Sequence, residues 1–407
     1  MKCRSCNKEE FLEFISLNSQ PPANAFLKES DFDKEVLYPL DVTCCSNCLL
    51  VQLTDESYIP RDKLFLDYAY ASSISGGLRN HFTELADKIK SEFNPKIVVD
   101  IGSNDGVLLK PLLELGCEAI GVEPAGNLAK QANNNELTTI CSYFDRDTVN
   151  KIISDNGKAD IVVASNVFAH LDEYHDIIEN IKRILSENGT FIVEVQYFAD
   201  MIRDMTFDNI YHEHVLYYTI HSMINLFDKH NMTLYNVEKI PTHGGSIRAY
   251  ISEGKSPQQS VNNLIREEKE NGIDNLHTLE NFNKKLQNNI EQIRELFIKL
   301  KKDNKRIFGY GAPAKSSTMI NSIGLDKSNI ELIIEDSPLK QGLFTPGSHI
   351  PITSSDILKK EMPDYLMIFA WNYADEIIKK VEDKYQKLNY IIPMPELRVI
   401  LKEKFDF

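Results

Sequence analysis

Apolar runs of strand length alternate with amphipathic segments from about residue 80 to residue 252. This alternation is typical of βαβ units around a parallel sheet. The predicted strands are residues 97–101, 119–123, 161–165 and 191–195, followed by a hairpin-like pair at 233–239 and 246–252. We therefore expect a central Rossmann-like α/β domain at residues 66–255.

Two other patterns follow this region and one precedes it. Residues 256–303 are polar with apolar positions at helical spacing, which predicts a helical connector broken near Asn271 and Gly272. Residues 304–407 return to a βα pattern and are expected to form a C-terminal Rossmann-like α/β domain. Residues 1–65 hold five of the seven cysteines and show little periodicity. They are expected to form a small module held by something other than a core of its own.

The charge of the chain limits its partners. Asp and Glu number 60 against 45 Lys and Arg, a net charge of −15 over 407 residues. Such a surplus opposes binding to nucleic acid and to anionic membranes. The first residues lack an apolar signal segment, and no apolar stretch of about 18 residues exists to span a bilayer. We expect a soluble, cytoplasmic monomer with neither a nucleic-acid nor a membrane partner.

Two Cys-x-x-Cys pairs predict a zinc site with four ligands: Cys3, Cys6, Cys45 and Cys48. Four thiolates can surround one zinc ion at about 2.3 Å per Zn–S bond and leave no open position, so such an ion is structural. Redox-active thiols are the alternative. Cys44 is a possible replacement ligand, but only Cys45 preserves the spacing. Cys117 and Cys141 are expected to be buried apolar side chains.

A glycine-containing loop after the first predicted strand points to a nucleotide-like cofactor. It runs from Asp100 through Gly102 to Gly106, where glycines allow a sharp turn and close approach of a ligand. Glu123 ends the next strand and is placed to accept two ribose hydroxyls, which NAD and S-adenosylmethionine both carry. The loop departs from the G-x-G-x-x-G of dinucleotide sites. With Asp100 in register, it favours S-adenosylmethionine.

A dense set of polar aromatic residues follows later strands. His170 comes after strand 161–165, at the edge of the sheet where ligands bind. The segment 211–214 reads Tyr-His-Glu-His. A neutral imidazole can abstract a proton beside a carbonyl, Tyr or a second His can stabilise the oxyanion, and a carboxylate can orient the imidazole. The set predicts acid–base catalysis of the kind that carbon methylation requires, but it does not separate His214 from His212. The i, i+2 spacing of these two residues disfavours a catalytic metal.

Two further segments offer substrate contacts. Between the last two predicted strands lie His243, Ser246 and Arg248, which suit either substrate oxygens or an ordinary hairpin. In the C-terminal region, a glycine-containing turn leads into a helix with Lys315 in its first turn. That arrangement predicts a diphosphate site, with His349 as a second candidate. The alternative is that this domain serves only as a scaffold.

Ordered motifs extend along nearly the whole chain. Besides the cysteine pairs they are YAYASS at 68–73, DIGSNDG at 100–106, GVEP at 121–124, NVFAH at 166–170, YHEH at 211–214, HGGSIR at 243–248, GYGAPAKSST at 309–318 and segments within 335–372. In these motifs the chain resembles the S-adenosylmethionine-dependent C-methyltransferases that act on nucleotide-linked 4-keto-deoxysugars. The resemblance implies a zinc-binding module, a methyltransferase domain and a Rossmann-like C-terminal domain.

The resemblance also implies residue roles. His214 would abstract the C-3 proton of a dTDP-linked 4-keto-deoxysugar, with Tyr211, Glu213 and His170 around the substrate. The cofactor would be held by Tyr70, Ser72, Asp100, Gly102, Asn104, Gly106, Glu123, Pro124 and Asn166. Leu49 departs from the family pattern, because a glycine is common after the last cysteine.

Other functions remain as alternatives. Methylation at C-5, or of a 3-amino sugar, would use the same groups. A zinc-ribbon RNA methyltransferase would need basic stripes that the charge balance does not supply. A non-catalytic sugar-nucleotide binding protein is disfavoured by the intact segment 211–214.

Overall fold

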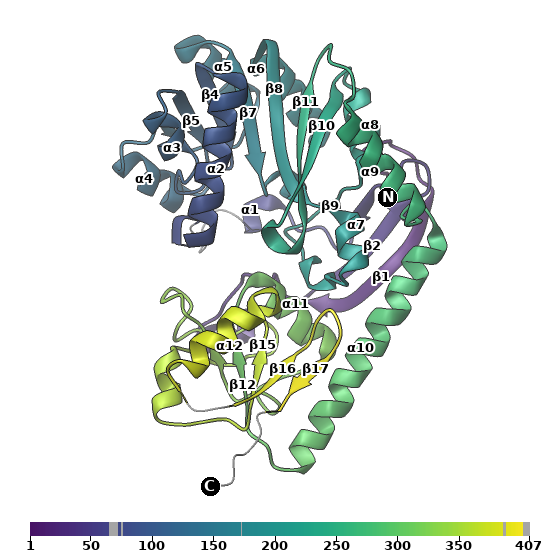
Figure 1. Cartoon of the computed structure of the whole chain (residues 1–407), viewed down its shortest axis with the longest axis vertical. Coiled ribbons are helices and arrows are strands. Elements are labelled where there is room, and N and C mark those ends of the chain that lie inside the picture. Colours follow the sequence, from purple (N-terminus) through teal and green to yellow (C-terminus); the bar gives the residue numbers. More distant parts are fainter. Residues whose placement is uncertain (65–71, 75, 172, 386–387, 402–407) are drawn as a thin grey trace.

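The computed structural model describes residues 1–64, 72–74, 76–171, 173–385 and 388–401. Its strands form three sheets, of four, seven and six strands, and Figure 1 shows the seven-stranded and six-stranded sheets as two separate bodies beside the long helix α10 (Leu276–Lys302). Among these described residues, no helix combines the length and the apolar character that crossing a bilayer requires.

The N-terminal module is a sheet that depends on the rest of the chain. It contains β1 (Phe11–Gln20), β2 (Tyr38–Cys45) and β3 (Val51–Leu53), and its fourth strand is β9 (Leu216–Tyr217) from far along the sequence. Two register shifts in the pairing of β1 with β2 interrupt the alternation of buried and exposed positions, which is why the sequence shows little periodicity here. The module has no separate core, since its buried side chains belong to the main hydrophobic cluster of the protein.

The seven-stranded sheet has the order β10-β11-β8-β7-β4-β5-β6. Its parallel strands are β4 (Ile97–Ile101), β5 (Glu118–Val122), β6 (Thr139–Ile140), β7 (Ala159–Ser165) and β8 (Leu185–Gln196). β10 (Thr233–Ile240) and β11 (Ser246–Ser252) complete it in antiparallel fashion. The predicted strands and hairpin pair are confirmed. Strand order reverses between β4 and β7, and ligands of such sheets bind at the carboxyl ends of the strands beside this point.

Helices connect the strands of this domain. They are α1 (Arg61–Leu64), α2 (Gly76–Phe93), α3 (Leu109–Glu114), α4 (Gly126–Asn134), α5 (Arg146–Asn156), α6 (Tyr174–Ile184), α7 (Phe198–Arg203) and α8 (Ile220–Asp228). In α6, Tyr174, Ile177, Ile181 and Ile184 are buried. Their spacing of three to four residues places them on one face of the helix, which packs on the sheet.

The segment 256–303, expected to be a helical connector broken near Asn271 and Gly272, contains two helices. α9 (Gln259–Glu270) and α10 are separated at Asn271 and Gly272, where Gly272 has a φ of +63° that favours glycine. α10 lies along β1 and the C-terminal helix α11 (Ala314–Ile323), and its buried residues Phe282, Leu286 and Ile293 join the main core. It therefore attaches the C-terminal domain to the N-terminal module.

The C-terminal domain has the predicted Rossmann-like α/β form. β14 (Ile352–Thr353), β13 (Ile333–Ile334), β12 (Ile307–Tyr310), β15 (Tyr365–Ile368) and β16 (Asn389–Ile392) are parallel neighbours, and β17 (Arg398–Ile400) is an antiparallel edge strand. α12 (Ala374–Glu382) lies between β15 and β16 in the chain. The fold class is confirmed, while the domain boundaries at residues 65, 255 and 303 stay predictions.

Candidate functional site

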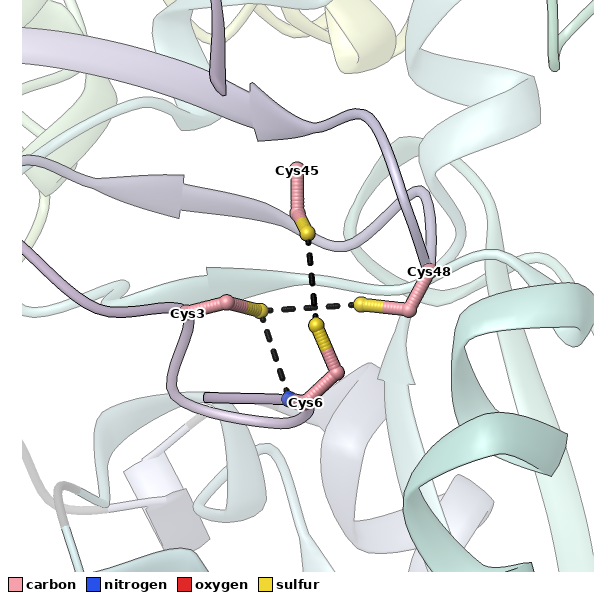
Figure 2. A group of neighbouring side chains, drawn as sticks. All are labelled: Cys3, Cys6, Cys45 and Cys48. Carbon is pink, nitrogen blue, oxygen red and sulfur yellow. Dashed lines mark hydrogen bonds between the residues drawn. The ribbon is translucent and has the colours of Figure 1, made fainter. Parts of the chain in front are cut away.

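The two cysteine pairs meet in one cluster (Figure 2). The four ligand atoms of Cys3, Cys6, Cys45 and Cys48 all lie within 4.8 Å of one another. Sγ of Cys3 lies 3.5 Å from that of Cys48, and Sγ of Cys6 lies 3.4 Å from that of Cys45. A tetrahedral zinc site with Zn–S bonds of about 2.3 Å separates its sulfurs by about 3.8 Å, whereas a disulfide needs about 2.05 Å. The cluster therefore fits a structural zinc ion.

The backbone around each pair forms the same turn. Asn7 donates its N–H to the Cys3 carbonyl at 2.9 Å, and Leu49 donates to the Cys45 carbonyl at 2.9 Å. Both residues have a φ of 58°, a conformation that is unfavourable for leucine and favours glycine at the position of Leu49. Cys44 lies outside the cluster, and Cys117 is buried as predicted. The prediction for Cys141 is wrong, because its side chain is exposed.

The glycine-containing loop after β4 packs tightly against the loop after β7. Gly102 has a φ of +67°, and a methyl group on its Cα would lie 2.4 Å from Cγ2 of Val167. Gly106 has a φ of +84° and is equally close to Leu137. Only glycine fits these two positions, so the loop has the tight backbone that close approach of a ligand requires.

Glu123 holds this loop in place after β5. Its carboxylate accepts the backbone N–H groups of Asn104 at 2.9 Å and Ala125 at 2.8 Å, and burial raises its pKa. The side-chain oxygen of Asn104 accepts the N–H of Ser72 at 2.9 Å. Asp100 lies behind the loop, where burial first, and then the charges of Glu123 and Glu194, raise its pKa well above the ordinary range.

A cavity of about 320 Å³ lies between the seven-stranded sheet and the C-terminal domain. The N-terminal module, the central α/β domain and the C-terminal domain all contribute residues to its lining. The central α/β domain supplies predicted site residues from five segments: Ser72, Gly102, Asn104, Glu123, Pro124, Asn166, His170, Tyr211 and His214. Two buried polar atoms at this lining, Oγ of Ser165 and Oδ1 of Asn166, have no hydrogen-bond partner within the described parts of the chain. Together with the glycine turn, they fit a polar cofactor such as S-adenosylmethionine.

Three predicted catalytic residues meet at the cavity. The rings of His214 and His170 are stacked with centroids 5.0 Å apart, and the Tyr211 ring lies 4.0 Å from that of His214. Nδ1 of His214 lies 2.7 Å from the carbonyl oxygen of Asn209. A carbonyl only accepts hydrogen bonds, so Nδ1 carries a hydrogen, and in the neutral ring Nε2 then carries the lone pair. The arrangement makes His214 a suitable general base.

The two residues before His214 bind the N-terminal module. Nε2 of His212 lies 3.0 Å from the Pro39 carbonyl, and burial lowers the pKa of His212. The Glu213 carboxylate accepts hydrogen bonds from Nδ2 of Asn24 at 2.8 and 2.9 Å. Neither residue lines the cavity. A backbone carbonyl, rather than the carboxylate expected from the sequence, therefore fixes the His214 ring.

Of the two predicted diphosphate contacts, only Lys315 lines the cavity. Its Nζ donates to Oδ1 of Asn372 at 2.6 Å and lies 5.1 Å from the Trp371 ring, and burial lowers its pKa. His349 instead stacks on Phe32 at 3.8 Å, with Nε2 2.9 Å from the Glu35 carboxylate.

The candidates of the hairpin segment have structural partners. Oγ of Ser246 donates to the Thr242 carbonyl at 2.9 Å, and Nε of Arg248 donates to the buried Glu194 carboxylate at 2.7 Å. Neither residue lines the cavity. The backbone of His243 forms part of a short 3-10 helix (Thr242–Gly244), and its side chain lies outside the described part of the structure, as does Tyr70.

Lys340 and Asn24 are among the lining residues that were not predicted. Lys340 donates its Nζ to the Ala312 carbonyl at 2.7 Å and lies 4.5 Å from the Phe26 ring. It belongs to a segment that carries the family resemblance, so that signal could have identified it. Asn24 lies in the irregular chain after β1, where no sequence pattern pointed to a site.

Three family models match successive parts of the chain: "Putative zinc binding domain" at residues 3–65, "Methyltransferase domain" at 70–237 and "C-methyltransferase C-terminal domain" at 241–395. The C-methyltransferase NovU of Streptomyces niveus is 34% identical over 410 residues, which cover 99% of this chain and 97% of NovU. The chain belongs to the C-methyltransferase family. This C-methyltransferase takes its methyl group from S-adenosylmethionine and has an N-terminal zinc-binding module.

More distant relatives match shorter parts of this C-methyltransferase. A ubiquinone biosynthesis O-methyltransferase of Glaesserella parasuis is 30% identical over 115 residues, 26% of this chain and 48% of that enzyme. Among solved structures, the PH0226 protein of Pyrococcus horikoshii is 14% identical with a TM-score of 0.36, over 47% of this chain and 97% of that protein.

Proposed function

We propose that this C-methyltransferase methylates C-3 of a dTDP-linked 4-keto-deoxysugar by way of an enolate. The observation that carries the proposal is the fixed ring of His214, which lines the cavity and has its hydrogen on Nδ1. Methylation of oxygen or nitrogen does not require a base for a C–H bond, whereas methylation of carbon does. The thymidine nucleotide and the 4-keto sugar rest on the resemblance in the ordered motifs.

The position of His214 at the cavity suits it to remove the C-3 proton of the sugar. A 4-keto group acidifies the C-3 hydrogen, and Nε2 of His214 takes that proton as the C–H electrons form an enolate. The Tyr211 hydroxyl and the His170 ring line the same cavity and are suited to stabilise the enolate oxygen. When bound, S-adenosylmethionine supplies an electrophilic methyl group for the new C–C bond.

Residues around the turn after β4 would hold this cofactor. Glu123 and Pro124 follow β5, Asn166 follows β7, and Ser72 bonds to Asn104 of the loop itself. They line the cavity at the strand-order reversal, where a cofactor of an open α/β sheet is expected. Gly106 and Asp100, which were also expected to bind the cofactor, do not line this cavity.

Lys315 and Lys340 line the cavity from the C-terminal domain and provide two cations in a protein of net charge −15. A diphosphate needs such a local concentration of positive charge, which supports a nucleotide-linked substrate.

Solvent deuterium uptake into dTDP-4-keto-6-deoxyglucose, followed by NMR without the methyl donor, tests the proposal. The wild-type enzyme should exchange the C-3 hydrogen, His214→Asn should not, and the matched His212→Asn variant should retain exchange. Absence of exchange at C-3 with the wild type would contradict the proposal. Exchange at C-5, or only with a 3-amino sugar, would favour the corresponding alternative.

A further inference from the structure

Asn24 is a residue of the N-terminal module that reaches the proposed active site. It follows β1 and lines the same cavity as His214 and Lys340, about 190 residues from the catalytic segment in sequence. A module that binds structural zinc has no need of a polar side chain at a substrate cavity. The position of Asn24 therefore calls for a role beyond folding of the module.

The orientation of the Asn24 amide is fixed by its partner. Nδ2 donates to Oε1 of Glu213 at 2.8 Å and to Oε2 at 2.9 Å. A carboxylate only accepts hydrogen bonds, so the amide nitrogen must face Glu213 and the amide oxygen must point elsewhere. This oxygen accepts no hydrogen bond from the residues that the structure describes, although it has two lone pairs.

The backbone around Asn24 is held on both sides by the C-terminal domain. Oγ of Ser317 donates to the Ala23 carbonyl at 2.9 Å. Leu27 exchanges backbone hydrogen bonds with Phe344, at 3.1 and 2.8 Å. The segment is thus fastened to α11 and to the chain before β14, so Asn24 presents its amide oxygen from a fixed position.

We propose that Asn24 is a substrate-binding residue whose amide oxygen accepts a hydrogen bond from a hydroxyl group of the sugar ring. This inference rests on the proposed function. The sugar is the expected partner because Glu213, which orients the amide, directly precedes His214, and the base must lie beside the reacting ring. An amide oxygen selects for a donor, so a ring hydroxyl is bound and a deoxygenated position is not.

A cycle of protein and ligand variants tests the contact. Calorimetric titrations, with S-adenosylhomocysteine present, compare dTDP-4-keto-6-deoxyglucose with its 2-deoxy and 3-deoxy analogues. One analogue should bind the wild-type enzyme about three- to tenfold more weakly than the parent sugar, the usual effect of one lost hydrogen bond. In Asn24→Ala that difference should disappear. Asn288→Ala, an exposed position on α10, is the matched control and should retain it.

Three results would overturn the inference. In the first, Asn24→Ala binds the parent sugar as tightly as the wild type does. In the second, the deoxy analogue still binds Asn24→Ala more weakly than the parent sugar, by the same factor as in the wild type. Either result would reduce Asn24 to a structural role. Unchanged affinity for S-adenosylhomocysteine checks that the variant is folded. In the third, the wild-type enzyme binds none of the three sugars, so the proposed function fails and the inference fails with it. The first two results differ from this one, because in them the wild-type enzyme still binds the parent sugar.

Discussion

Nδ1 of His214 donates a hydrogen bond to the carbonyl of Asn209, five residues earlier, over 2.7 Å. The bond requires one of the two neutral tautomers of the ring and leaves Nε2 as an acceptor. It also joins the base to a segment that continues toward the C-terminal domain, because the neighbouring Asp208 accepts the indole N–H of Trp371 at 2.7 Å.

The tautomer of His214 can be observed directly. We expect ¹⁵N-histidine NMR at a pH above the titration of the ring to show a protonated Nδ1 and an unprotonated Nε2 for this residue, because a carbonyl partner excludes the opposite form. The His214→Asn spectrum assigns the signals by their loss. A signal of His214 with its hydrogen on Nε2 would contradict the orientation described here.

The sequence was informative where local pattern decides structure. β4 and β11 have the predicted bounds, and the cysteine spacing predicted the four-sulfur cluster. It could not show that β9, only two residues long, completes the sheet of the module, because that pairing joins Val51 to Tyr217. No local signal encodes a contact over such a separation.

The site residues also divide into those that a local sequence pattern identifies and those whose contacts it does not specify. Gly102 and Glu123 could be identified because a tight turn after a strand requires particular residue types. Arg248 and His349 belong to recognisable motifs, but a motif does not specify where a side chain points. Both bind carboxylates, Glu194 and Glu35, outside the cavity lining.

Loss of zinc should affect catalysis as well as stability. Cys45 ends β2, which pairs with β3, and β3 pairs with β9 just after His214. We expect Cys45→Ser to lose bound zinc, to unfold at a temperature lower by about 5 °C or more, and to lose activity in proportion to the disorder of this sheet. Metal analysis, calorimetry and methyl-transfer assays measure the three effects. The control is Cys44→Ser, which lies next to the cluster but outside it and should keep its zinc. Full activity of a metal-free Cys45→Ser enzyme would contradict the expected effect of zinc on catalysis.

Substrate binding should weaken at alkaline pH. Burial lowers the pKa of Lys315, although the nearby Asp208 carboxylate opposes the effect, and burial likewise lowers that of Lys340. As the pH rises through these lowered values each ammonium loses its proton, so the charge that holds a diphosphate is present below them and is lost above them. We expect the KM for the nucleotide sugar to rise about tenfold or more well before the ordinary lysine pKa of about 10.4.

Arginine substitution provides the control for this titration. In the Lys315→Arg/Lys340→Arg double variant the guanidinium groups stay charged to a pH above about 12, so the alkaline rise of KM should disappear. The KM for S-adenosylmethionine, measured in the same assays, should not follow the titration of these lysines. A wild-type KM for the nucleotide sugar that is constant up to about pH 10 would remove both lysines from diphosphate binding.

Trp371 should report the arrival of the nucleotide. It is the single tryptophan of the chain, its indole N–H is bonded to Asp208, and the Lys315 ammonium lies 5.1 Å from its ring. A diphosphate that pairs with Lys315 changes the electrostatic field at the ring. We therefore expect thymidine diphosphate to change the tryptophan emission in a saturable way, and thymidine, which lacks the diphosphate, to leave it unchanged. Lys315→Met keeps much of the side-chain volume without the charge and should suppress most of the response. An equal response to thymidine, or an undiminished response in Lys315→Met, would place the diphosphate away from Lys315.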